Sequence, residues 1–295
     1  MKALVLVERF DAVSGLAAGA RTLADEVLVV SFGDAELPEG VADVVIQIAL
    51  PQGAVLDDAG DTVIALYNEK NPDVVLVEPT RHMKSIAGKL AAHLGVAVIT
   101  DVFSLENDIA SSLYFGGVGV RTQKPTQIGI YTIAPEVFSG AIPAGTNATE
   151  AFDWVEPKQA LKLIDSRPVE KSGVDLNKAE TVVGAGRGFA EKEDLELARA
   201  LCEKINAGLG CSRPLTEGVD WLPSETYIGV SGLMLSPKVY VALGISGQMQ
   251  HMVGCNRAQK MFAVNKDANA PIFKQCDYGL VGDIKTVLPA LVAAL

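Results

Sequence analysis

The sequence is short of positive charge and of long hydrophobic runs, and each shortage excludes a class of protein. Its 25 lysines and arginines stand against 36 acidic residues, which gives a formal net charge of -11. A chain of this sign is poorly suited to nucleic-acid backbones or anionic membranes. No apolar run reaches membrane-spanning length, and Pro289 interrupts the C-terminal one. We therefore expect no nucleic-acid partner and no integral membrane segment.

Patterns for metal binding, disulfides and hydrolysis are missing as well. The four cysteines are scattered, with no C-x-x-C pair and no zinc spacing. Neither His82 nor His93 stands at metal or triad spacing from the acids between 101 and 108. No nucleophile with its base is present, so hydrolysis is not expected. Met1 leads directly into a strand-length run without a signal peptide, and we expect a cytoplasmic protein with reduced thiols.

The first half of the chain alternates apolar runs of strand length with stretches of helix length. Such alternation predicts a mostly parallel sheet covered by helices on both faces. Strands are expected at 3–7, 26–32, 44–48, 73–78 and 96–100, and helices at 58–69 and 84–93. Runs at 113–121 and 127–133 resemble antiparallel strands that close an edge, and a last sheet element is expected near 151–155.

Length and proline punctuation after residue 135 predict two domains. We expect an N-terminal α/β domain at 1–165, a linker at 166–178 and a C-terminal domain at 179–295. The second domain has a helix at 192–206, a final helix at 284–295, and strands near 181–183, 209–211, 227–230, 239–243 and 261–265. The expected fold class is α/β, with two mostly parallel, Rossmann-like sheets flanked by helices.

The stretch that begins at Tyr240 says most about function. A short apolar run enters the turn G-I-S-G (244–247), and a helix-like segment follows at 248–251. Free N–H groups at a helix start, aided by the helix dipole, hold anions such as pyrophosphate. A second apolar run ends in Asn265 and a third in Asp277. Polar groups at the ends of successive buried strands predict a nucleotide site.

These motifs carry a family resemblance. G-I-S-G-x-x-Q-H, then x-N-K-D-x-x-A-P-I-F and x-D-Y-G-x-V-G-D, resemble the FAD-binding domain of the α subunit of electron transfer flavoprotein. The resemblance is strong from about Thr181 to the C-terminus and looser, in layout more than motif, before it. C-S-R-P (211–214) and Q-H-M-V-G (250–254) further resemble the bacterial branch associated with carnitine and acyl-CoA reduction.

The resemblance implies FAD as cofactor and a heterodimer. The C-terminal domain is expected to hold FAD, and the N-terminal domain to pack against a β subunit that covers the flavin. The function implied is electron transfer with an acyl-CoA dehydrogenase/reductase-type or quinone-reductase redox partner. The chain is expected to turn over no substrate of its own.

Specific residues acquire roles from the resemblance. Arg187, in a Gly-rich turn, offers a planar fork to phosphate, although alone it is equally a solvent-facing arginine. Arg213 is implied at the flavin, where a cation stabilises the charge of the reduced ring. His251 is implied at the pyrimidine edge of the flavin. The full expected FAD set is Arg187, Ser212, Arg213, Ile228, Gly229, Val230, Ser231, Ser246, Gly247, Gln248, Met249, Gln250, His251, Asn265, Asp283 and Ile284.

Two positions depart from the family pattern, which carries Gln and Thr where this chain has Val230 and Ser231. Ser231 keeps a hydroxyl for flavin N5, whereas Val230 loses a polar side chain. We expect this departure to bear on the flavin's potential more than on FAD binding. Asn265, Asp283 and Ile284 match positions at the adenosine and phosphate half of FAD. Alone, Asp283 suits the N-cap of the last helix equally well.

Two other functions stay open from the residues alone. A self-contained FAD- or NAD-dependent oxidoreductase of a small substrate needs a pocket with an acid–base pair, and the sequence offers no convincing one. A redox-silent nucleotide-binding regulatory module would have no use for Arg213, Ser231 and His251 together.

Overall fold

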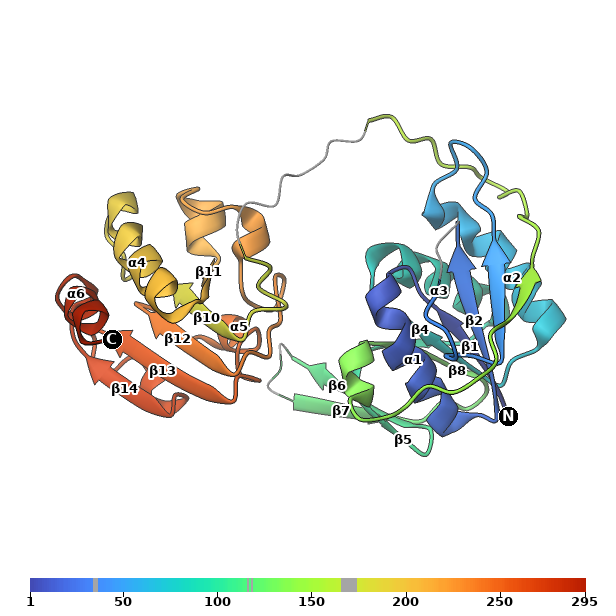
Figure 1. Ribbon diagram of the computed structural model, residues 1–295, viewed down its shortest axis with the longest axis horizontal. Helices are drawn as coiled ribbons and strands as arrows, with labels where there is room; N and C mark the ends of the chain where they lie inside the picture. The colour runs from blue at the N-terminus through green and yellow to red at the C-terminus, as the bar shows by residue number, and fades with distance from the viewer. Residues whose placement is uncertain (34–36, 116, 118, 166–173) are drawn as a thin grey trace. The chain divides into compact units, whose positions relative to one another are not determined.

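The computed structural model describes residues 1–33, 37–115, 117, 119–165 and 174–295. By internal contacts the chain divides into two compact units, Met1–Tyr114 with Gly119–Pro168, and Phe115–Val118 with Val169–Leu295. Each unit is built around one β-sheet (Figure 1). Residues 166–173 of the expected linker lie outside the described residues. The limits 1–165 and 179–295 remain a prediction about independently folding domains.

The first unit contains a nine-stranded sheet with the order β7-β6-β5-β8-β4-β1-β2-β3-β9. Only the β5–β6 and β6–β7 pairs are antiparallel among its described strands. The strands are β1 (Lys2–Leu6), β2 (Glu26–Phe32), β3 (Val44–Ile48), β4 (Val74–Val77), β5 (Val98–Glu106), β6 (Ile109–Tyr114), β7 (Gly119–Gln123), β8 (Gly129–Ile133) and β9 (Ala148–Ala151). The helices are α1 (Phe10–Leu23), α2 (Gly60–Lys70) and α3 (Arg81–Leu94).

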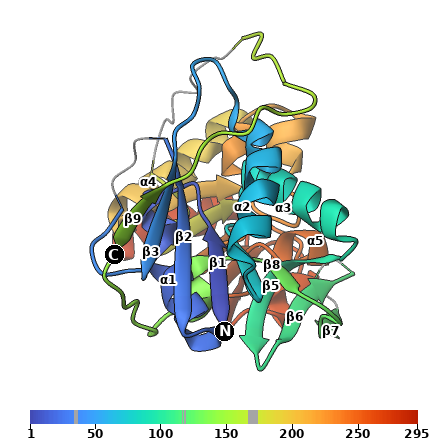
Figure 2. The same cartoon turned by 90° about the vertical axis from the view of Figure 1, so that its right-hand side faces the viewer.

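Alternate residues of the central strands belong to two separate hydrophobic cores, one on each face of the sheet. Val5 and Val29 pack with Leu16 of α1 on one face, whereas Leu4 and Ile46 pack with helices α2 and α3 on the other. Figure 2 shows α1 apart from the α2–α3 pair, with the strands between them. Both faces of the sheet are therefore covered, which explains why its strands are nearly continuous apolar runs.

The second unit contains a five-stranded sheet, entirely parallel, with the order β11-β10-β12-β13-β14. From β10 the chain first adds β11 on one side and then β12, β13 and β14 on the other side. Ligands of open α/β sheets bind at such a switch point, which here lies between β10 and β12. The strands are β10 (Thr181–Ala185), β11 (Gly208–Cys211), β12 (Val239–Leu243), β13 (Lys260–Asn265) and β14 (Tyr278–Val281). The helices are α4 (Leu195–Ile205), α5 (Met249–Met252) and α6 (Ile284–Ala294).

Two different layers cover this second sheet. Helices α4 and α6 pack on one face, with Leu201 and Leu288 in the core beside Val183. Irregular chain covers the other face, where Ile228 and Ile272 pack against the sheet. Helix α5 lies on this same face, since its Met252 packs in the core with Ile228 and Ile272.

Two expectations for the first unit are wrong. Residues 127–133 were expected to form an antiparallel edge strand, but β8 lies inside the sheet, parallel to both β4 and β5. All five β8 residues are buried, which an interior position requires. The expected strand 113–121 is instead interrupted between β6 and β7, which pair as a hairpin; residues 116 and 118 lie outside the described residues.

Three expectations for the second unit also need correction. Residues 227–230 form only isolated bridges, because the chain turns back at Gly229, whose N–H bonds to the Leu233 carbonyl. The helix-like segment after the G-I-S-G turn is only the four residues of α5. Asp277 precedes β14 instead of ending a strand, and it accepts a hydrogen bond from the Met261 N–H near the start of β13. Asp277 therefore lies at the edge of the sheet opposite the strand ends.

Candidate functional site

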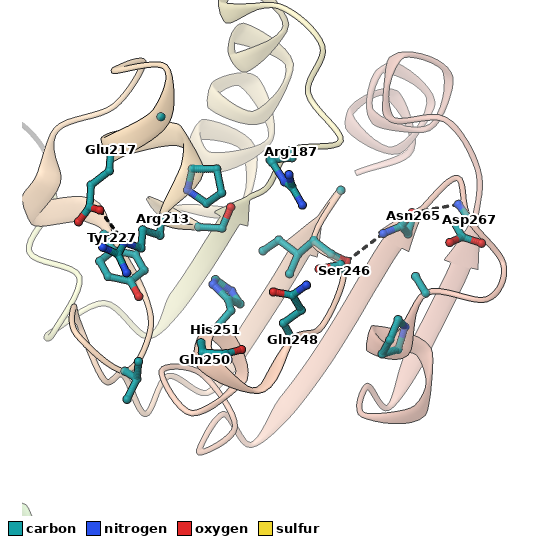
Figure 3. A pocket seen from close by; sticks show the side chains of 18 residues that line it. Arg187, Arg213, Glu217, Tyr227, Ser246, Gln248, Gln250, His251, Asn265 and Asp267 are labelled. Atoms are coloured by element: carbon teal, nitrogen blue, oxygen red, sulfur yellow. Dashed lines mark hydrogen bonds and ion pairs between the residues drawn. The ribbon is translucent and has the colours of Figure 1, made fainter. Parts of the chain in front are cut away.

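A cavity of about 650 Å³ lies at the carboxyl ends of four strands in the second unit. Its lining residues follow β10 (Arg187), β11 (Ser212), β12 (Ser246) and β13 (Asn265, at that strand's end). Side chains from these separate segments converge on one hollow (Figure 3). Its volume falls within the range of about 300–1,000 Å³ typical of ligand sites. The position is the one where an open α/β sheet binds a nucleotide.

Glycines let the two loops at the switch point touch each other. A Cβ at Gly186 would lie 2.5 Å from the Gly244 carbonyl oxygen, and one at Gly188 would lie 2.5 Å from Gly244 Cα. Gly188 N–H also donates to the Gly244 carbonyl at 2.9 Å. Glycines in such turns can permit close backbone approach to a ligand. Their first effect is to pack the loop carrying Arg187 against the G-I-S-G turn.

The G-I-S-G turn presents a row of unused backbone donors. Among the hydrogen bonds found between described residues, none has the N–H of Ser246, Gly247 or Gln248 as donor. Helix α5 is too short for a strong dipole, so any anion binding here relies on these N–H groups and on nearby cations. Gly247 has φ +86°, and a Cβ there would lie 2.4 Å from the Ile272 nitrogen. A larger residue at 247 would therefore strain the fold as well as the ligand site.

The two arginines of the cavity differ in their surroundings. Within the described part of the chain, the Arg187 side chain has no hydrogen-bond or ion-pair partner, and Figure 3 shows it directed toward the centre of the cavity. Arg213 instead donates from Nε to Glu217 Oε2 at 2.6 Å. This hydrogen bond raises the pKa of Arg213 above its usual value. Among the described lining residues, Arg187 is thus a cation without a partner and Arg213 a cation compensated by Glu217.

His251 enters the cavity from α5 and is only 8% exposed. Its Nε2 lies 2.8 Å from the fully buried Tyr240 hydroxyl, whereas its Nδ1 is buried without a hydrogen-bond partner among the described residues. Burial lowers the pKa of His251 to about 4. The Ile228 backbone opposes this shift more weakly, through a contact whose geometry does not reach that of a hydrogen bond. The imidazole of His251 is therefore neutral at pH 7. Its unpartnered nitrogen suits a polar ligand atom.

Buried thiols stand behind the cavity without joining its chemistry. Burial raises the pKa of Cys211 to about 11 and that of Cys255 to about 12, so both stay protonated at neutral pH. All four cysteines are free. Burial also raises the pKa of Tyr240 well above its usual value. In the described part of the chain, no group of three or more His, Cys, Asp or Glu side chains could hold a metal.

Asn265 stabilises the cavity wall from within. Its Nδ2 donates to the Ile245 carbonyl and its Oδ1 accepts from the Asp267 N–H, both at 2.9 Å. One amide thus ties the end of β13 to the G-I-S-G turn. Asp267 lines the cavity beside it.

The structure brings many, but not all, of the expected site residues to the cavity. Ile228 and Ile284 are buried in the two cores, and Asp283 is the N-cap of α6, accepting from the Lys285 N–H at 2.8 Å. Gly229, Ser231, Gly247 and Met249 lie outside the lining, although Ser231 Oγ is 3.5 Å from the hydroxyl of the lining residue Tyr227. The expected residues that do line it are Arg187, Ser212, Arg213, Val230, Ser246, Gln248, Gln250, His251 and Asn265.

Sequence reasoning missed several lining residues. Ile245, Asp267 and Pro271 belong to the motifs that identified the region and could have been added from them. Glu217 stands four residues after Arg213, a spacing that brings side chains together on a helical turn. Tyr227 lies in an irregular segment, and no pattern in the sequence points to it.

Comparison with known proteins adds family information to this geometry. Two family models match the chain: the electron transfer flavoprotein FAD-binding domain over residues 175–256 and the electron transfer flavoprotein domain over residues 11–157. Protein FixB of Escherichia coli O139:H28 (strain E24377A / ETEC) is 38% identical over 289 residues, which cover 94% of this chain and 92% of that protein. Protein FixB of Shigella dysenteriae serotype 1 is 37% identical over the same length and coverage.

One of the solved structures that match shows only weak similarity. A protein described as a candidate UDP-N-acetylglucosamine 2-epimerase of Listeria monocytogenes is 11% identical, with a TM-score of 0.37, over 100% of this chain and 88% of that one. Likeness of this degree supports no statement about the chain.

Proposed function

Because this chain belongs to the electron transfer flavoprotein family as an α subunit that binds FAD, we propose that its FAD lies in the cavity at the strand ends of the second unit. One observation carries the placement. The unused N–H groups of residues 246–248 and the unpartnered Arg187 line one cavity at the switch point of the sheet. Backbone donors and a free guanidinium are the groups that bind a diphosphate.

The remaining lining residues suit the flavin half. Arg213 and His251 lie in the same cavity as the diphosphate donors, and Nδ1 of His251 is a buried polar atom without a protein partner in the described chain. FAD supplies the one- and two-electron chemistry when bound. Ser212, Gln248 and Gln250 add hydrogen-bonding side chains that can orient the ring. Asn265 stabilises the cavity wall. That Asp283 and Ile284 contact FAD remains a prediction.

We propose further that the chain carries electrons without turning over a substrate of its own. The acid–base pair expected of an independent oxidoreductase has no support in the cavity. Two carboxylates of the described residues line the cavity: Glu217 is bound to Arg213, and Asp267 accepts a hydrogen bond from the Asn269 N–H. The lining imidazole of His251 is neutral and hydrogen-bonded to Tyr240. These groups position and tune a cofactor more readily than they relay protons to a substrate.

An α subunit of this family pairs with a β subunit. We propose that the first unit packs against that β subunit and that the redox partner is an acyl-CoA dehydrogenase/reductase-type or quinone-reductase protein. The C-S-R-P and Q-H-M-V-G motifs support a role in acyl-CoA or carnitine metabolism. No described helix is long and apolar enough to cross a membrane. We place the protein in the cytoplasm, where four free thiols are the common state.

Arg187→Ala tests the placement of FAD. Loss of a charge-assisted hydrogen bond to the diphosphate costs about 1.5–3 kcal/mol, so the dissociation constant of FAD should rise roughly tenfold to hundredfold. It is measured by flavin fluorescence on the chain co-expressed with its β subunit. Arg199→Ala is the matched control, because Arg199 is an exposed arginine of α4 paired with Glu196 outside the cavity. Equal affinities in both variants would place the diphosphate elsewhere.

A further inference from the structure

The second cation of the cavity, Arg213, has an acidic partner, Glu217. Arg213 precedes the π-helical turn Pro214–Gly218, and its carbonyl accepts from the Thr216 N–H at 3.1 Å and the Glu217 N–H at 3.0 Å. Leu215 and Thr216 are 2% and 8% exposed, so the turn is anchored in the core. The turn thereby holds Arg213 and Glu217 on the side that faces the cavity, four residues apart.

The contact between the two side chains is directional. Glu217 accepts from Nε of Arg213, the nitrogen nearest the side-chain stem. In the described part of the chain, no other side chain occupies the terminal nitrogens of this guanidinium. These remain available as donors toward the cavity while the Nε contact restricts the rotation of the group. Glu217 also brings a negative charge into a cavity that, on the proposed function, takes up a further negative charge on reduction.

From this arrangement, and resting on the proposed function, we infer that Glu217 is a positioning residue that orients Arg213 and partly cancels its charge at the flavin. It thereby keeps the first-electron potential of the bound FAD lower than Arg213 alone would set it. Arg187 has no comparable partner among the described residues, so the compensation applies to Arg213 and not to Arg187. Both side chains are more than half exposed, at 60% and 55%, so solvent and salt weaken the effect without removing it.

The test is a cycle of variants in the chain co-expressed with its β subunit. The first-electron potential of bound FAD is measured by anaerobic redox titration. Glu217→Gln removes the compensating charge and should shift the potential upward. Arg213→Ala should shift it downward, because it removes the cation and leaves Glu217 alone. The double variant Arg213→Ala/Glu217→Gln should recover part of that downward shift.

Two further variants separate charge from structure. Glu217→Asp keeps the carboxylate, so the potential should stay near that of the wild type if the charge of residue 217 matters. A purely structural role of residue 217 predicts no such agreement. Glu196→Gln is the matched control, because it breaks an exposed Arg–Glu pair outside the cavity and should leave the potential unchanged. An unchanged potential in Glu217→Gln, beside a shifted one in Arg213→Ala, would overturn the inference.

Failure of the inference remains distinguishable from failure of the proposed site. FAD occupancy and affinity are recorded for every variant by flavin absorbance and fluorescence. Full occupancy with no response at residue 217 contradicts the charge-compensating role and leaves the FAD site in place. If neither Arg187→Ala nor Arg213→Ala changes the potential or the FAD occupancy, the proposed FAD site is wrong. The inference about Glu217 is then wrong as well.

Discussion

At the residue scale, His251 carries the clearest physical signal in the second unit. Its side chain is nine-tenths buried, one ring nitrogen contacts the Tyr240 hydroxyl, and the other has no partner among the described residues. The family resemblance implies that this histidine lies at the pyrimidine edge of the flavin. Burial opposes protonation, because an apolar environment disfavours the charged form. His251 therefore acts in the FAD-free chain as a neutral hydrogen-bonding group.

This burial predicts how stability changes with pH. The pKa of His251 is about 4 in the folded chain and about 6.5 in the unfolded chain. Between these values the unfolded chain binds more protons, so the free energy of unfolding falls as pH falls from about 6.5 to about 4. Across this pH range the free energy of unfolding changes by about 3 kcal/mol. Denaturant titrations of the FAD-free protein at several pH values measure it.

Two variants assign the slope to one histidine. His251→Gln should flatten the pH dependence by about one proton within that window, whatever its stability at pH 7. His93→Gln is the control, because His93 lies on the exposed side of α3 and should leave the slope unchanged. An unchanged slope in His251→Gln would show that His251 does not control this pH dependence.

At the element scale, the predictable parts of the fold are those with a strong periodic signal. The strands β2, β3 and β12 match their expected bounds because each is a buried apolar run between turns. The segment 227–230 is also largely apolar but forms no strand, since the chain turns back at Gly229 toward Leu233 and the Val230 N–H bonds to the distant Gln250 carbonyl. The sequence pattern also does not reveal that β8 lies inside the sheet, because the direction of strand pairing depends on the whole sheet.

Helix α6 shows where one residue has two reasonable roles. Asp283 fits a FAD-binding position by resemblance and an N-cap by local chemistry. The structure realises the cap, with Asp283 Oδ1 2.8 Å from the Lys285 nitrogen. The same helix buries Leu288 completely and packs on α4. The cap therefore stabilises an element that covers one face of the FAD-binding sheet.

Asp283→Ala should lower the free energy of unfolding by about 1 kcal/mol, because the first turn of α6 loses an acceptor. Asp283→Asn keeps a capping oxygen and should cost only a fraction of that amount. Both values come from denaturant titration, with FAD affinity measured in parallel. An affinity that drops in both variants while stability holds would instead assign Asp283 to the cofactor.

At the scale of the whole molecule, exposed apolar surface is unevenly distributed. In the second unit it gathers on the edge strand β14, where Tyr278, Leu280 and Val281 are 58%, 52% and 55% exposed. The Tyr278 ring stacks on Phe262 of β13 at 4.9 Å, which extends the apolar surface onto the neighbouring strand. An open edge strand with large apolar side chains is a common site of aggregation. The net charge of -11 opposes self-association.

This balance predicts that the chain self-associates when it is made alone and forms a monodisperse heterodimer with its β subunit. Light scattering at micromolar concentration measures both. Leu280→Lys places a charge on the exposed edge and should reduce self-association of the lone chain. Ala200→Lys is the control, since it adds the same charge at an exposed position of α4 away from that edge. If both lysine variants reduce self-association equally, net charge, not the edge strand, controls it. A lone chain that stays monomeric and loaded with FAD would instead show that neither the β subunit nor the apolar edge governs its assembly.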